Sequence, residues 1–435
     1  MDFLFQLTPL KYMVAPLWRD EAFSVMLATQ NWLSILSITA RDFNPPLYYL
    51  VLKVWIMVLG QSEIALRSLS LIFFLGTVYI VDHIFEEIFK LPFLKRLPYL
   101  LLIILNPLLL YYGFEGRMYS MSAFFATASF YALYTKKKRL YFWATVLGLY
   151  THYFMVFVIA SQWFYLKFVE RSKDRLSWIY KSVLWFVPWL IFLLIMKPAS
   201  STDFWIEPVK LSQLFVLPGV LYTGYERSFD FLQRSASQDP TILVQFSIAV
   251  LVAVGYAYYV RTKKTKNSLL WYLLIWAFAG PLLVFVISFV KPIYYPRYLI
   301  YATVGLSLLL CYTLEKIPFI VRIIVFILLL HFSWSYQSLQ IAHREKKYPA
   351  VKIQEIKKIM GPTDMLYVTN VLDYFVAQYY IGRDKVALYG LTYNEIPSYV
   401  GKALIPPEVL QKPLPYYPKR AFILKDNGTY EIQSL

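Results

Sequence analysis

Long apolar segments follow one another along this chain, most of them near the length that a bilayer requires, with short polar loops between them. The pattern predicts ten spanning helices, at 64–83, 97–112, 118–135, 140–150, 153–169, 178–196, 241–260, 269–290, 297–314 and 317–336. The run 47–60 is shorter and Lys53 interrupts it, so it fits an interfacial helix better. Residues 1–17 carry Asp2 and Lys11, and they form either a shortened first span or a stretch preceded by an upstream start.

The last part of the chain has a different pattern. Short strands are predicted at 364–370, 385–390 and 420–426, and helices at 349–360 and 371–381. We therefore expect two domains. Residues 1–338 form a transmembrane domain whose first outer loop, 18–63, carries interfacial helices, and residues 339–435 form a small α/β domain.

Threading the predicted spans alternately through a bilayer brings most basic loop residues to one side. These residues are Lys90, Lys95, Arg96, Lys136, Lys137, Lys138, Arg139, Arg171, Lys173, Arg175, Arg261, Lys263, Lys264 and Lys266. Short loops rich in Lys and Arg face the cytoplasm. The first loop and the domain 339–435 are then extracytoplasmic, because long folded domains escape the charge rule.

Composition supports the membrane assignment. The chain is 59% hydrophobic and 16% charged, whereas a soluble domain is about 25% charged. The predicted fold class is a mainly α, polytopic membrane protein with about 10–11 transmembrane helices, interfacial helices and a small C-terminal α/β domain. A net charge of +17 can indicate nucleic-acid binding, but these charges lie in short loops, so we expect none. The single cysteine, Cys311, excludes an intramolecular disulfide and a cysteine-based metal cluster.

A polar stretch at the start of the chain carries the first candidate chemistry. Asp20 and Glu21 open it, and Asp42 and Asn44 close it just before a proline pair. Acids at a helix start can simply cap the first turn and favour the helix dipole. At a dry membrane boundary, however, a carboxylate can take a proton from an attacking hydroxyl or amine.

Arginines at the predicted outer ends of two other spans carry the second candidate chemistry. Arg117 lies between Glu115 and Tyr119, and Arg297 lies among tyrosines. Either arginine can be an interfacial anchor, but a guanidinium fork also suits a phosphate, and Glu115 could hold that fork in place. His152 lies at the same level; a lone histidine is more often a satisfied structural residue, and a polar site is the alternative.

Several common motifs do not occur in the sequence. It contains no Walker loop, no dinucleotide glycine pattern and no HExxH helix. This argues against a nucleotide-driven pump, a zincin and a nucleotide-sugar enzyme on a Rossmann domain. Acids and arginines gathered at one membrane surface instead suit a substrate that is itself a lipid phosphate, because arginines can stabilise charge on a departing phosphate.

Three segments, taken in order, resemble a known family. They are WRDEAFS at 18–24, RDFNPPLYYLVLKVWIMVLGQSEIALRSLS at 41–70 and YYGFEGRMYS at 111–120. They resemble the bacterial branch of the protein mannosyltransferase and aminoarabinose transferase superfamily, membrane glycosyltransferases of the GT-C fold. The resemblance covers about residues 18–170, and the rest of the chain fits in layout.

The resemblance implies a sugar donor on a polyprenyl phosphate, extracytoplasmic transfer and inversion at the anomeric centre. The family's first-loop acid corresponds to Asp20, with Glu21 beside it, and its Arg and Tyr after the third span correspond to Arg117 and Tyr119. Relatives commonly carry His or Lys where this chain has Asn44. Paired acids can bind a divalent ion, but the resemblance implies none, so a metal requirement stays open.

We therefore predict a polyprenyl-phosphate-sugar-dependent glycosyltransferase with Asp20 as base and Glu21 in support. Substrate contacts are expected from Asp42, Asn44, Glu115, Arg117, Tyr119, His152 and Arg297. The long loop 197–240, with Trp205, Glu207, Tyr222 and Tyr225, could cover the donor or select the acceptor, which could be lipid, glycan or protein. The alternatives are a flippase for lipid-linked saccharides, which would need polar residues at mid-membrane, and a catalytically idle scaffold.

Overall fold

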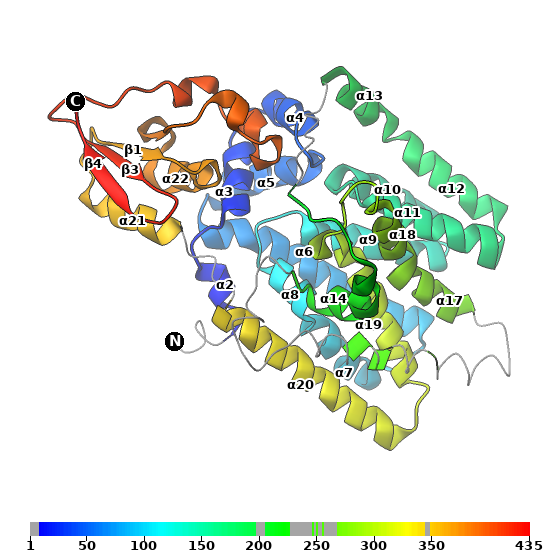
Figure 1. Cartoon of the computed structure of the whole chain (residues 1–435). Coiled ribbons are helices and arrows are strands. Elements are labelled where there is room, and N and C mark those ends of the chain that lie inside the picture. Colours follow the sequence, from blue (N-terminus) through cyan, green and yellow to red (C-terminus); the bar gives the residue numbers. More distant parts are fainter. Residues whose placement is uncertain are drawn as a thin grey trace. The chain divides into compact units, whose positions relative to one another are not determined.

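The computed structural model describes residues 8–196, 205–226, 246–247, 249–250, 255, 268–343 and 349–435. Of the described residues, 71% are helical, and one small sheet lies near the C-terminus (Figure 1). It divides into two compact units. The helical unit comprises Met1–Lys11, Ser70–Pro188 and Ile206–Arg344, and the mixed unit comprises Tyr12–Leu69, Trp189–Trp205 and Glu345–Leu435.

Consecutive helices build the helical unit. Those that matter below are most of α6 (Glu63–His83), α7 (Phe93–Ile104), α8 (Pro107–Gly113), α9 (Tyr119–Tyr134), α10 (Lys138–Thr151), α11 (Met155–Phe164), α12 (Lys173–Leu184), α14 (Leu217–Thr223), α17 (Ser268–Leu274), α18 (Gly280–Ile287), α19 (Ile300–Leu314) and α20 (Phe319–His343). The core lies around α9 and α19, where Phe130 stacks on Trp276 with ring centroids 4.2 Å apart. Gly305 admits this indole, since a Cβ there would lie 2.7 Å from it.

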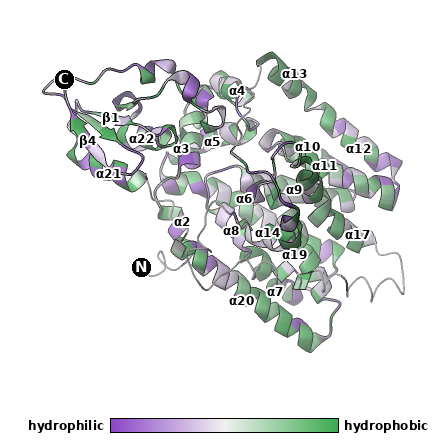
Figure 2. Ribbon diagram, in the orientation of Figure 1, coloured by the Kyte–Doolittle hydropathy of each residue, from purple (hydrophilic) through white to green (hydrophobic). Residues whose placement is uncertain are grey.

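Five helices in the described part of the chain are long and apolar enough to cross a membrane, and the pair α7 and α8, bent by 72°, would make a sixth. The five are Glu63–Ile88, Lys173–Met196, Ser268–Ile287, Pro296–Leu314 and Phe319–Ala342. Figure 2 shows the apolar colour along α20 and along α13 (Val187–Met196). Helices occupy nine of the ten predicted spans; the tenth, 241–260, lies almost wholly outside the described residues. The total of ten or eleven stays a prediction.

The bend between α7 and α8 has a local cause. Pro107 has no backbone N–H to continue the helix of α7, and it stands at the first position of α8. The Asn106 side chain accepts a hydrogen bond from the Leu109 amide at 3.0 Å and so caps the new helix. The apolar run predicted as one straight span at 97–112 is therefore two helices, and α8 leads directly into the turn that carries Glu115 and Arg117.

The mixed unit joins the first loop of the chain to its last part. The first loop supplies α3 (Arg19–Ala28), α4 (Trp32–Ala40), α5 (Leu47–Leu59) and the first turns of α6. The last part supplies α21 (Ala350–Ile359), α22 (Tyr374–Ile381), β1 (Met365–Val368), β2 (Val386–Leu388), β3 (Ala421–Leu424) and β4 (Tyr430–Gln433). The sheet order is β2-β1-β3-β4, with β1 parallel to β2 and β3, and β4 antiparallel to β3.

These elements confirm the fold class. The three predicted strands and both predicted helices of the α/β part are present, and α5 is the short helix expected at 47–60. The strand β4 is an addition that the sequence pattern did not predict. It is a sheet-edge strand with mostly exposed residues, so no buried face marks it in the sequence. The predicted boundary between 338 and 339 falls inside α20 and stays a prediction.

Candidate active site

The helical unit gathers four of the predicted site residues, together with Tyr298, which was not among them. The arginine–tyrosine cluster, as we call it, consists of Arg117, Tyr119, His152, Arg297 and Tyr298. The Arg297 guanidinium carbon lies 5.7 Å from the Tyr119 ring centroid, 5.9 Å from that of Tyr298 and 4.7 Å from that of Tyr295. Cations at this distance are attracted to aromatic faces, so Arg297 is held over three tyrosines. This is more than a single anchoring contact at a membrane surface.

Arg117 and Glu115 occupy the turn between α8 and α9. Both are buried. The Glu115 carbonyl accepts a hydrogen bond from the Arg117 amide at 2.7 Å, and the Arg117 carbonyl accepts one from the Ser70 hydroxyl of α6 at 3.2 Å. The Ser120 hydroxyl donates to the Tyr112 carbonyl at 2.7 Å and joins the two ends of the turn. The backbone of Arg117 is thus fixed by its neighbours in sequence and by α6.

His152 ends α10 and lies within the cluster. Its ring centroid is 5.9 Å from that of Tyr119 and 5.5 Å from that of Tyr298. Nδ1 accepts a hydrogen bond from the Phe154 amide at 3.1 Å, so a neutral imidazole carries its proton on Nε2. Burial lowers the pKa of His152 to about 3, helped by the charges of Arg117 and Arg297. The imidazole is therefore neutral and senses the positive potential of both arginines.

The Nε2 atom of His152 gives the strongest indication of a ligand in the cluster. It is buried and has no hydrogen-bond partner among the described residues. A buried donor without an acceptor costs about 1–3 kcal/mol, and such a group in a native structure calls for an explanation. Together with two nearby arginines, it marks a position suited to the oxygen of an anion.

Sequence reasoning missed Glu226. Its side chain is 2% exposed, and its two oxygens accept hydrogen bonds from the Tyr112 hydroxyl at 3.0 Å and the Tyr295 hydroxyl at 2.9 Å. Tyr112 packs on Tyr119 with centroids 4.8 Å apart, and the Arg297 guanidinium lies over the Tyr295 ring. The buried Glu226 carboxylate therefore contacts the arginine–tyrosine cluster indirectly, through the rings of Tyr112 and Tyr295. The sequence signal was an acid within the aromatic-rich loop 197–240.

The long loop also contained residues that the prediction placed at the substrate. Tyr222 is instead a core residue of α14, 1% exposed, whose hydroxyl lies 2.8 Å from that of Ser333. Trp205, Glu207 and Tyr225 lie at the described margins of the loop. Residues 197–204 and 227–240 lie outside the described part, so a role of the loop as a cover stays a prediction.

The mixed unit holds the predicted acids. Asp20 and Glu21 stand in the first turn of α3, as the sequence indicated, but their surroundings differ. Asp20 is half-buried, whereas Glu21 is 1% exposed. The Glu21 oxygen atoms accept from Arg67 Nε at 2.8 Å and Arg67 Nη2 at 2.7 Å, and Oε2 also accepts from the Trp18 amide at 3.0 Å. These hydrogen bonds occupy both oxygens of Glu21, which leaves Asp20 as the better candidate for a base.

Arg67, the partner of Glu21, was not predicted. Its Nη1 donates to the carbonyls of Met13 and Ala15, and its Nη2 donates to that of Pro16. A buried arginine near the start of an apolar helix needs partners, and that need was the available signal. Asp42 and Asn44 lie half-buried between α4 and α5, where the Asp42 amide donates to the Thr39 carbonyl at 3.2 Å. Their expected substrate contacts stay predictions.

Metal ligation was tested on the described residues. Within them, no group of three or more His, Cys, Asp or Glu side chains is arranged to hold a metal ion. The cluster described above offers guanidinium, imidazole and phenol groups, which suit an anion better than a cation. Whether the reaction requires a metal ion stays open, as in the sequence analysis.

Comparison with solved structures identifies the fold. The chain is similar to the crystal structure of ArnT from Cupriavidus metallidurans in the apo state, with a TM-score of 0.64 and 12% sequence identity over 97% of this chain and 91% of that chain. It is also similar to the same protein bound to undecaprenyl phosphate, with a TM-score of 0.62, 11% identity and the same coverage. No family model and no curated protein sequence matches the chain.

These similarities establish the fold alone. The chain has the GT-C fold of aminoarabinose transferase ArnT, as the three sequence motifs implied. It is a multi-pass membrane protein. They do not establish the reaction, which depends on the residues of the site.

Proposed function

We propose that this protein transfers a sugar from a polyprenyl-phosphate-linked donor to a hydroxyl or amine acceptor on the extracytoplasmic face of the membrane, with inversion. One observation carries the proposal. The buried Nε2–H of His152 has no acceptor among the described residues, and its ring packs near those of Tyr119 and Tyr298 and senses the charge of Arg117 and Arg297. The neighbour that binds undecaprenyl phosphate has the same fold.

The cluster supplies what a donor phosphate requires. A guanidinium presents several donors in a planar fork and keeps its charge, and a neutral imidazole adds one more donor without adding charge. The tyrosine faces hold Arg297 in one orientation before the ligand arrives. Donors fixed in advance stabilise charge that develops on a departing phosphate more effectively than groups that must reorient.

Asp20 is the proposed base. Its carboxylate takes the proton from the acceptor hydroxyl or amine as the oxygen or nitrogen attacks the anomeric carbon. The bond from that carbon to the phosphate oxygen breaks, and the electron pair leaves with the polyprenyl phosphate. Attack from the face opposite the leaving group inverts the anomeric centre. Asp42, Asn44, Glu115 and Tyr119 are proposed substrate contacts.

Replacing Asp20 by Asn tests this function. Asn keeps the shape at this position, which is the second residue of α3 and not its N-cap, but it has no basic lone pair. Turnover should fall by about a hundredfold or more, with unchanged melting temperature and donor binding. The assay measures transfer from a purified polyprenyl-phosphate-sugar to extracted cell-envelope acceptors. Near-normal turnover would remove Asp20 as base, and no transfer by the unaltered protein with any donor and acceptor would favour a flippase or a scaffold.

The side of the membrane has its own test. The basic loops motivate a cytoplasmic Lys137 and an extracytoplasmic Asn427. In a Cys311→Ala background, a cysteine introduced at Asn427 should react with a membrane-impermeant thiol reagent in intact cells, and one at Lys137 should react only after the cells are broken. The reverse labelling would place the acids and the α/β part in the cytoplasm and overturn the proposed location.

A further inference from the structure

The helix that carries the proposed base, α3, has an unusual arrangement of charges in its first turn. Arg19 precedes Asp20 and Glu21 follows it, and both neighbours are held by partners from other segments of the mixed unit. Glu21 pairs with Arg67 of α6, with side chains 2% and 3% exposed. Arg67 also binds three carbonyls of the segment that leads into α3. One side of the turn is therefore fixed to α6.

The other side of the turn is fixed to the last part of the chain. Arg19 Nε donates to Oδ1 of Asp373 at 2.7 Å, and Arg19 Nη2 forms an ion pair with the same oxygen at 2.6 Å. The Asp373 side chain is 2% exposed and stands just before α22. These contacts join residues more than 350 positions apart. The α/β part therefore binds Arg19, the residue next to Asp20.

The grip continues along the whole of α3. Figure 1 shows α22 beside α3. Phe23 packs edge-on against Phe375 with centroids 5.4 Å apart, and Gly401 leaves room for the Phe23 ring, since a Cβ there would lie 2.5 Å from it. At the far end, Arg383 donates to the Met26 carbonyl at 3.0 Å and also bonds the Thr29 hydroxyl. The α/β part thus contacts the first turn, the middle and the last turn of α3.

Helix α22 also reaches the neighbouring segments. The Tyr380 hydroxyl donates to Glu63 at 2.9 Å and accepts from the Leu17 amide at 2.9 Å. The Tyr379 hydroxyl donates to the Gln61 carbonyl at 2.6 Å. The entry to α3 and the start of α6 are therefore held by the same helix, which fixes the frame in which Asp20 stands.

We infer that the C-terminal α/β part is a positioning element for the acid-bearing helix α3, and that Arg19, Glu21, Arg67 and Asp373 are positioning residues that hold Asp20 in place from both sides. The inference rests on the proposed role of Asp20. Its physical basis is that misplacing a reacting group by about 1 Å can cost about a hundredfold in rate. The backbone at Asp20 cannot shift far without breaking the ion pair of Arg19 or that of Glu21.

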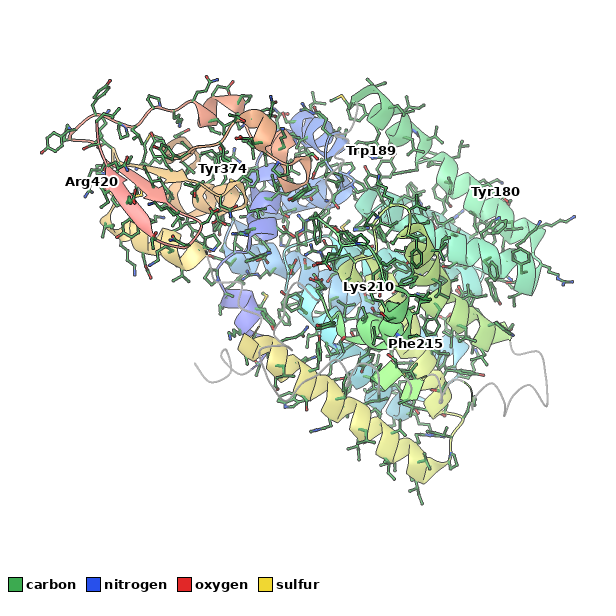
Figure 3. All side chains as sticks on the ribbon, viewed as in Figure 1. Tyr180, Trp189, Lys210, Phe215, Tyr374 and Arg420 are labelled. Carbon is green, nitrogen blue, oxygen red and sulfur yellow. The ribbon has the colours of Figure 1, made fainter. Side chains whose placement is uncertain are left out.

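The chain offers a matched pair of variants. Asp373→Asn weakens the grip on α3. Asp364→Asn is the control: Asp364 is equally buried, lies in the same α/β part and pairs with Arg420 Nη2 at 2.6 Å, but it joins β3 to the segment before β1 instead of contacting α3. Figure 3 labels Arg420 beside the sheet, away from Tyr374 on α22. Both variants remove one buried carboxylate charge.

Two measurements on the full-length protein in detergent are required. Amide hydrogen exchange should show faster exchange of residues 19–28 in Asp373→Asn than in Asp364→Asn. In the transfer assay, Asp373→Asn should lower kcat by about tenfold to a hundredfold with the donor KM unchanged, whereas Asp364→Asn should leave kcat near the parent value. The exchanged pair Arg19→Asp/Asp373→Arg should recover part of the protection and of kcat.

The outcomes separate the inference from the proposed function. Equal exchange of α3 in the two variants, or equal kcat losses at matched melting temperature, would overturn the positioning role. Faster exchange in Asp373→Asn, together with Asp20→Asn retaining full turnover, would show that the grip exists but that Asp20 is not the base it was proposed to position. In that case the α/β part still holds α3, but the inference that it positions a catalytic base fails together with the proposed function.

Discussion

Charged side chains are used differently in the two units. In the mixed unit, Glu21 and Arg67 meet in a buried, two-point ion pair, and backbone groups supply their further hydrogen bonds. In the helical unit, Arg297 lies over tyrosine faces, and the nearby His152 keeps a buried donor without an acceptor among the described residues. Ion pairs that are complete within the fold indicate a structural role, whereas a donor awaiting an acceptor indicates a ligand.

The comparison also separates two adjacent acids. Glu21 has its oxygens occupied and is buried, and Asp20 is half-buried one position earlier. A carboxylate that already accepts several hydrogen bonds is a poor base, because those bonds favour its charged form. This supports the less enclosed acid, Asp20, as the proposed base, whereas the more enclosed Glu21 anchors the first turn of α3 to Arg67.

Breaking the complete pair should give the largest effect. Arg67→Ala leaves Glu21 buried without its cation, which should lower the free energy of unfolding by about 3–5 kcal/mol. Replacing both partners, as in Glu21→Leu/Arg67→Met, should recover much of this loss, since the desolvation cost disappears with the charges. The measurement is thermal and denaturant unfolding in detergent.

An exposed pair provides the control for Arg67→Ala. Lys137 and Glu87 lie 2.9 Å apart with side chains 42% and 37% exposed. Glu87→Gln should cost less than about 1 kcal/mol, because solvent screens the pair. If Arg67→Ala cost no more than Glu87→Gln, the buried pair would not be the support that its geometry indicates.

Removing a cluster arginine should affect ligand binding more than folding. Arg117→Ala and Arg297→Ala should each weaken binding of undecaprenyl phosphate by about 1.5–3 kcal/mol, the usual value of a hydrogen bond to a charged group. Arg117→Lys should recover only part, since the ammonium lacks the planar fork. Binding can be measured by tryptophan fluorescence in detergent. Unchanged affinity in Arg117→Ala would place Arg117 outside the phosphate site.

The smallest effect concerns pH. The pKa of His152 in the folded protein is lowered to about 3, against about 6.5 when unfolded. Above pH 6.5 both states are neutral and stability does not depend on this group. Between 6.5 and 3 only the unfolded state gains the proton, so the free energy of unfolding should fall by up to about 1.4 kcal/mol per pH unit.

The matched variant for this prediction is His152→Gln, which keeps a side-chain donor but does not titrate in this range. It should show a shallower loss of stability between pH 6.5 and 5 than the parent protein. Parallel pH profiles of the two proteins would mean that His152 titrates normally and is not enclosed by the arginines. Polyprenyl phosphate can be added to both proteins to test whether the anion changes the difference.

Much of this protein could be predicted from its sequence. Apolar length located helices in nine of the ten predicted spans, of which the described residues give five that are long and apolar enough to cross a membrane, and short apolar runs located β1, β2 and β3. Arg117, His152 and Arg297 were predicted because each stands at a helix end on one predicted side of the membrane, and helix ends on one side of a bundle can meet. Tyr119 was predicted from the family resemblance. The fold gathers these four.

Only the tertiary structure decided which charges pair. Glu21 and Arg67 are 46 positions apart, and Arg19 and Asp373 are 354 apart; no local pattern encodes such partners. The distinct environments of Asp20 and Glu21, the burial of Glu226 and the core position of Tyr222 follow from the same packing. Helix length and burial are properties of a segment and can be read along the chain. The environment of a charge depends on whatever the folded chain places beside it, and that is settled only when distant segments meet.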